Sequence, residues 1–155
     1  MSSDDAPPVS SGRRSALRAM AGGAALLIVR PARATPEELT AAIHELFAER
    51  PISPGRIKLE VPRLAENGNI VPVTVVVDSP MTEQDYVKSI HLFAESNPQP
   101  RIADIELGPY NGRPRVATRV RVAISQHLHA IALMSDGSLW STAVEIEVTV
   151  GGCAP

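Results

Sequence analysis

The sequence predicts a mainly β domain: an antiparallel immunoglobulin-like β-sandwich of about seven strands, with one helix at its N-terminal end. Three observations predict this fold. The hydrophobic periodicity changes from the helical period to alternation after Arg50. Short β-branched runs then follow one another with turn signals at regular spacing. Finally, 14 prolines and 10 glycines in 155 residues are too many for a helical bundle.

The first 34 residues differ in composition from the rest and predict an export signal. The arginine pair Arg13 and Arg14 precedes a short apolar run over residues 19–29, and an Ala-x-Ala pattern ends at Ala34. The apolar run is shorter than the roughly 20 residues that cross a bilayer. These parts are typical of a secretory leader, and the paired arginines resemble a twin-arginine signal. An ordinary export signal with a chance arginine pair is the alternative.

We therefore expect a signal peptide over residues 1–34, a β-sandwich domain over 35–150 and a short C-terminal arm over 151–155. The expected location is the periplasm, and we expect no membrane segment in the mature chain. The single helix should begin after Thr35, because Glu38 stands three residues later as in a capping box and Pro36 suits the first turn. It should end at Arg50, since Pro51 follows.

The strands follow the helix, separated by turns. Arg115 to Ile124 alternates most cleanly, with Val120 and Val122 on one face and Arg119 and Arg121 on the other. A hairpin is predicted at residues 135–138. The seven predicted strands are 57–61, 70–78, 86–94, 101–107, 115–124, 127–134 and 139–150.

Charge and composition exclude several functions. A formal net charge of -2 and 3% aromatic residues argue against a nucleic-acid binding protein. One cysteine permits neither an intrachain disulfide nor a site with several thiolate ligands. No sequence motif of a nucleotide-binding loop, a nucleophile elbow or a zinc protease occurs.

The histidines give no strong catalytic or metal signal. His127 and His129 point to the same side of a predicted strand, so a third ligand would complete a metal site, but no spacing demands one. His44 and His91 have no partner nearby in the sequence that suggests a triad. For His127 and His129 the favoured interpretation is partly exposed strand histidines, and we expect no metal, no cofactor and no catalytic residue. A basic stripe is formed by four arginines, Arg113, Arg115, Arg119 and Arg121. The favoured interpretation is a strand face exposed to solvent, and the alternative is a surface that contacts an anion or a partner protein.

The end of the chain is more informative. Cys153 follows Gly151 and Gly152 just beyond the last predicted strand, where burial is difficult. Two glycines remove side-chain bulk and backbone restriction, so the thiol is expected on a flexible arm. From Val150 such an arm reaches ~10 Å. That arrangement suits the covalent presentation of cargo to another protein. The alternative is a structural or adhesive module whose cysteine forms an interchain disulfide.

Eight segments of the sequence carry a recognisable set of motifs. They are Ala65–Asn69, Val71–Val75, Asp78–Thr82, Asp85–Lys88, Ile90–His91 with Phe93–Glu95, Thr118–Arg121, Met134–Ser138 with Trp140, and Val148–Cys153. In these segments the chain resembles the SoxY family, the sulfur-substrate carriers of periplasmic thiosulfate oxidation. The likeness covers most of the sequence after the leader, and the leader resembles the family's as well.

The resemblance implies that Cys153 is the attachment site for sulfur intermediates, on a swinging arm that contains Gly151 and Gly152. It implies a heterodimer with a SoxZ-like subunit. It further implies service to a thiosulfate-conjugating haem enzyme, a sulfate-releasing hydrolase and a sulfane dehydrogenase, while the carrier itself catalyses nothing. The family's arm has two glycines after the cysteine, where this chain has Ala154 and Pro155.

Overall fold

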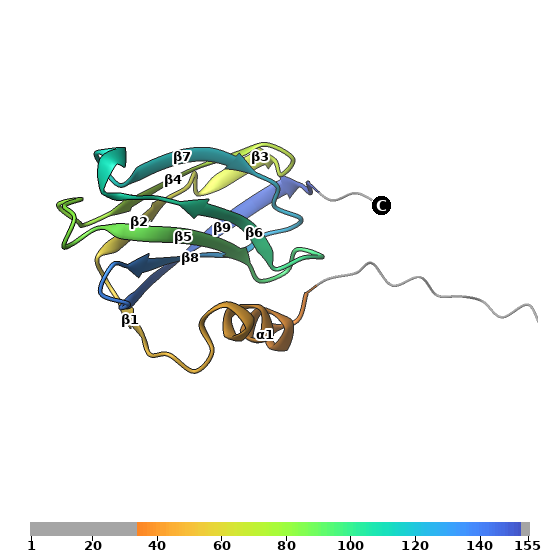
Figure 1. Ribbon diagram of the computed structural model, residues 1–155. Coiled ribbons are helices and arrows are strands. Elements are labelled where there is room, and N and C mark those ends of the chain that lie inside the picture. Colours follow the sequence, from red (N-terminus) through yellow and green to blue (C-terminus); the bar gives the residue numbers. More distant parts are fainter. Residues whose placement is uncertain (1–33, 153–155) are drawn as a thin grey trace, which may run out of the picture. The chain divides into compact units, whose positions relative to one another are not determined.

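The computed structural model describes residues 34–152, and those residues form a two-sheet β-sandwich with one α-helix (Figure 1). The larger sheet has the strand order β1-β9-β8-β5-β6, and β3 joins it by pairing with β9. The smaller sheet has the order β2-β4-β7. The elements are α1 (Pro36–Phe47), β1 (Ile52–Pro54), β2 (Ile57–Glu60), β3 (Leu64–Asn67), β4 (Val71–Val77), β5 (Val87–Ala94), β6 (Arg101–Glu106), η2 (Pro109–Asn111), β7 (Arg115–Val120), β8 (Gln126–Met134) and β9 (Leu139–Val150).

The predicted fold class is confirmed, with two more strands than expected. Each of the seven predicted segments corresponds to one observed strand, although β8 begins one residue earlier than predicted, and the residues described add β1 and β3. Both additions pair with β9 in parallel, so the larger sheet is not purely antiparallel. They are 3 and 4 residues long, and neither alternates regularly between buried and exposed residues as β2 does.

Helix α1 begins where the sequence places it. The Thr35 hydroxyl accepts a hydrogen bond from the Glu38 amide, and the Glu38 carboxylate accepts one from the Thr35 amide. The predicted end at Arg50 is wrong, because the helix ends at Phe47. Ala48 takes a positive φ of 52° there, which turns the chain out of the helix before Pro51 can interrupt it.

Two apolar clusters hold these layers together. The larger lies between the sheets and includes alternate residues of β4, the fully buried Val71 and Val75 among them. The smaller lies between α1 and the larger sheet, where Phe47 packs with Phe93 and Ile131. Helix α1 therefore covers part of the outer face of the larger sheet, as Figure 1 shows. No helix within residues 34–152 is long and apolar enough to cross a membrane.

Candidate functional site

The end of β9 meets two other segments in a compact backbone junction. The Gly68 amide donates a hydrogen bond to the Val150 carbonyl oxygen at 2.8 Å, and the Val122 amide donates to the Gly68 carbonyl oxygen at 2.8 Å. The Gly152 amide then donates to the Val122 carbonyl oxygen at 2.9 Å. The last described residue of the chain is thus held by the segment that follows β7, which in turn is held by the turn after β3.

The junction is so close that it accepts no side chain at three positions. A Cβ atom on Gly68 would overlap the Val122 carbonyl oxygen and would lie 2.7 Å from the Gly152 nitrogen. A Cβ on Gly152 would overlap the Gly68 carbonyl group, and one on Gly151 would overlap the Ala123 carbonyl oxygen. Real Cβ atoms do not make such contacts, so these glycines allow three backbone segments to pack directly on one another.

A buried amide side chain supports the segment that receives Gly152. Asn97 is 6% exposed, and its Nδ2 atom donates to the Arg121 carbonyl oxygen at 2.8 Å. Its Oδ1 atom accepts from the Ala123 amide at 2.8 Å and from the Gln126 side chain at 3.0 Å. Asn97 therefore fixes the backbone on both sides of Val122, and with it the surface against which Gly151 and Gly152 lie.

The sequence-based expectations meet this geometry only in part. Cys153, the expected attachment site, lies directly after the junction and outside the described residues, as do Arg13 and Arg14 of the expected leader. Gly151 and Gly152 are described, and the structure gives them close backbone contacts. Their expected flexibility stays a prediction. Gly68 was missed as a residue of this region, although it lies within a segment that resembles the SoxY family.

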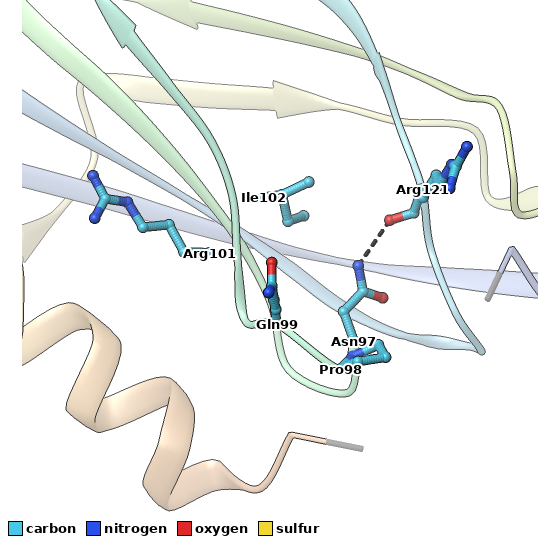
Figure 2. Close-up of a pocket in the computed structure, with 6 residues that line it drawn as sticks. All are labelled: Asn97, Pro98, Gln99, Arg101, Ile102 and Arg121. Atoms are coloured by element: carbon cyan, nitrogen blue, oxygen red, sulfur yellow. Dashed lines mark hydrogen bonds between the residues drawn. The ribbon is translucent and has the colours of Figure 1, made fainter. Parts of the chain in front are cut away.

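A shallow hollow of about 310 Å³ lies beside the junction, between the turn after β5 and the segment after β7. Its lining includes Asn97, Gln99, Ile102 and two arginines, Arg101 and Arg121. Figure 2 shows the two guanidinium groups at opposite edges and directed away from each other. Arg101 is also engaged by a carboxylate, at 2.6 Å from Asp104. The two arginines are therefore not arranged to bind one ligand together in this hollow.

His127 and His129 share a carboxylate rather than a metal ion. His129 Nε2 lies 2.8 Å from one oxygen of Glu95 and His127 Nδ1 lies 3.2 Å from the other. Partial burial raises the pKa of Glu95, but the hydrogen bonds from the two imidazoles outweigh it, and the net pKa lies below the ordinary value. Among residues 34–152 no three His, Asp or Glu side chains are arranged to hold a metal.

His91 has partners that sequence spacing does not reveal. Its Nε2 atom lies 2.8 Å from the Ser89 hydroxyl and its Nδ1 atom lies 2.6 Å from Asp104. Ser89, His91 and Asp104 are the residue types of a catalytic triad, but Ser89 and His91 are both only 8% exposed. Phe47 of α1 packs edge-on against the His91 ring, with centroids 5.1 Å apart. The arrangement is that of a buried histidine with a hydrogen-bond partner at each ring nitrogen.

The predicted basic stripe is exposed, as expected. Val120 and Val122 are buried, whereas the four arginines at residues 113, 115, 119 and 121 point to solvent. This is the pattern of a strand with one face on the core and one in water. The alternative role in anion or partner contact stays a prediction.

Comparison with known proteins identifies the family. The family model of the sulfur oxidation protein SoxY matches residues 43–153. The solved sulfur carrier protein SoxY from Chlorobium limicola f. thiosulfatophilum is similar at 30% identity and a TM-score of 0.61, over 74% of this chain and 98% of that one. Comparison with curated proteins gives no match.

More distant solved structures share the sandwich. The superoxide reductase (neelaredoxin) of Ignicoccus hospitalis is similar at 22% identity and a TM-score of 0.54, over 74% of this chain and 94% of that one. A superoxide reductase from Nanoarchaeum equitans gives 20% identity and a TM-score of 0.52, over 62% and 100%. At such identities the likeness shows the fold alone. The SoxY match spans both sheets and the terminal junction, and on that match the chain belongs to the SoxY family of sulfur oxidation proteins.

Proposed function

We propose that this protein is a periplasmic carrier that holds sulfur intermediates of thiosulfate oxidation covalently on Cys153. The observation that carries the proposal is the place of the only cysteine in the 155-residue sequence. It directly follows Gly152, whose backbone is held at the end of the sandwich by Val122. The thiol thus follows the last described strand in the sequence, and we propose that a partner enzyme reaches it there. Membership of the SoxY family, and the carrier function of the Chlorobium relative, support the same reading.

The chemistry requires one S–S bond to the thiol. In the loading step the terminal sulfur of thiosulfate bonds to Cys153 Sγ, one proton leaves the thiol, and two electrons pass one at a time to the haem enzyme. Hydrolysis of the resulting S-thiosulfonate by water then breaks the bond between its outer sulfane sulfur and the sulfonate group, which releases sulfate and leaves a persulfide on the cysteine. The thiolate is the reactive form, and a free thiol with a pKa of about 8.5 is mostly protonated at neutral pH. We propose that the partner's pocket promotes its ionisation.

The proposed carrier has no catalytic site of its own. Two groupings within residues 34–152 resemble catalytic sites: the pair of histidines on Glu95 and the buried chain of Ser89, His91 and Asp104. In the first, both imidazoles bond to one carboxylate, and in the second the buried serine and histidine are hydrogen-bonded to each other. These contacts are sufficient structural reasons for both groupings, which supports a protein that delivers its cargo to enzymes.

The proposed partners follow from the family. They are a SoxZ-like subunit in a heterodimer, a thiosulfate-conjugating haem enzyme, a sulfate-releasing hydrolase and a sulfane dehydrogenase. The proposed route to them is export through the twin-arginine pathway, directed by Arg13 and Arg14, with removal of the leader at Ala34.

Intact mass spectrometry tests the function. The protein is incubated with thiosulfate and a thiosulfate-conjugating haem enzyme, and its mass is measured without reductant. An adduct removed by dithiothreitol, present on the wild type and absent from Cys153→Ser, is the expected result. Circular dichroism of the variant should match the wild type, because Cys153 lies after the last strand. A disulfide-linked dimer as the sole product would contradict the carrier and favour the structural module.

A further inference from the structure

The backbone junction at the end of β9 has a consequence for where the terminal arm begins. Sequence reasoning places the start of the arm at Gly151, on the ground that two glycines are flexible. In the structure Gly151 and Gly152 lie against the backbone of Ala123 and Gly68, and Gly152 is buried. The same absence of a Cβ that gives a free chain its flexibility here permits close packing.

We infer that Gly68 is a positioning residue for the proposed carrier arm: it clamps the C-terminal segment through Gly152, so that the arm is anchored at Gly152 rather than at Val150. Three hydrogen bonds run through the clamp in sequence, from Gly68 to Val150, from Val122 to Gly68 and from Gly152 to Val122. Gly68 takes part in two of them and lies between the other two segments. This inference rests on the proposed function, because only a carrier uses the reach of its terminal thiol.

The distance that the thiol can reach from the sandwich depends on whether the clamp is closed or open. With the clamp closed, the Cα atom of Cys153 stays ~3.8 Å from that of Gly152, the fixed spacing across a trans peptide bond. With the clamp open, Gly151 and Gly152 extend with the tail and add ~7 Å. A partner whose reactive centre lies deeper than the closed reach must open the clamp on docking. A shallow partner engages the arm with the clamp closed.

The clamp is held by few contacts, so its opening is compatible with a shuttle. Gly151 and Gly152 contribute no side chains, and opening them breaks the one hydrogen bond between Gly152 and Val122. The receiving side stays in place, since Asn97 holds the backbone on both sides of Val122. The tail therefore opens as a unit without disturbing the sandwich.

A nitroxide spin label on the single cysteine tests the clamp, because the sequence contains no second thiol. The full chain is labelled at Cys153, and label mobility is compared between the wild type, Gly152→Ala and Gly68→Ala. An alanine at residue 152 overlaps Gly68, and the overlap is relieved by release of the tail. The clamp therefore predicts a more mobile label in both variants. On a free flexible stalk, alanine at residue 152 stiffens the chain and makes the label less mobile, and alanine at residue 68 changes nothing. Either of those results would overturn the inference.

Amide hydrogen exchange gives an independent readout and covers a variant that folds poorly. We expect the Gly152 amide to be protected in the wild type and to exchange at least tenfold faster in Gly68→Ala. Gly108→Ala is the matched control, because a Cβ there meets only the Asn111 side chain at 3.7 Å. If Gly68→Ala does not fold, Gly151→Ala serves instead, since its overlap with Ala123 is relieved on the tail side. An unprotected Gly152 amide in the wild type would refute the clamp. No sulfur compound is used, so failure of the carrier chemistry leaves these results unchanged.

Discussion

His91 and Asp104 face each other on the neighbouring strands β5 and β6, with the histidine Nδ1 atom 2.6 Å from a carboxylate oxygen. The other carboxylate oxygen lies 2.6 Å from the Arg101 guanidinium group. Burial raises the pKa of Asp104, but the hydrogen bonds from Arg101 and His91 more than offset it and lower the net pKa. A single carboxylate thus satisfies a buried imidazole and an arginine at the edge of the larger sheet.

Removal of that carboxylate should destabilise the fold. Asp104→Ala leaves the Nδ1 atom of the buried His91 without its partner, and an unsatisfied buried polar group costs about 1–3 kcal/mol. Urea denaturation followed by circular dichroism measures the change in the free energy of unfolding. Glu106→Ala, an exposed carboxylate at the end of the same strand, is the control and should be close to neutral. Equal effects of the two substitutions would contradict the role given to Asp104.

Stability should fall as the solution becomes acidic. Glu95 and Asp104 have folded-state pKa values below their ordinary values of 4.5 and 3.8. Each carboxylate therefore contributes stability that is fully present above its ordinary value and is lost as the pH falls through the lowered one. Denaturation curves between about pH 6 and pH 2 should show this loss. Glu95→Gln should flatten the dependence, and an unchanged slope in that variant would rule out its contribution.

The isolated protein should form disulfide-linked dimers in air. Its one cysteine has no internal partner, and the expected compartment is oxidising. Non-reducing gels of the wild type should show a dimer band that dithiothreitol removes, and Cys153→Ser should show none. A covalent dimer of the serine variant under denaturing conditions would contradict this prediction.

Export should depend on the arginine pair. Replacement of Arg13 and Arg14 by lysine keeps the charge of the leader but removes the feature that marks a twin-arginine signal. The double variant should stay as full-length precursor in the cytoplasm, as cell fractionation and blotting would show. A matched Arg18→Lys variant should be exported. Arrival of the processed double variant in the periplasm would show that an ordinary export signal is at work.

Local sequence signals predicted the elements whose causes are local. The capping box at Thr35 and Glu38 and the alternation of β7 each involve only a few neighbouring residues, and both appear in the structure. The end of α1 at Phe47 was missed, because the positive φ of Ala48 has no signal as strong as the proline at residue 51. Strands β1 and β3 were missed because each depends on pairing with β9, far along the chain.

The sequence was sufficient to identify the key residue of the candidate site, but not the contacts around it. The isolated cysteine after two glycines is visible in the sequence, so Cys153 could be singled out directly. The contacts of those glycines could not, because Gly68 and Val122 lie tens of residues away. The same holds for His91, whose partner Asp104 is brought near by the pairing of β5 with β6. Long-range pairing, which a single sequence does not display, accounts for both gaps.

The place of β9 in the larger sheet has a consequence for biosynthesis. This strand pairs with β1, β3 and β8, and it is the last of the described strands to be synthesised. Until Leu139–Val150 is free, β8 has an uncovered edge and β1 and β3 lack their partner strand. The larger sheet is therefore completed only once β9 has been made, and a nascent chain stalled before β9 should be a target for chaperones and proteases.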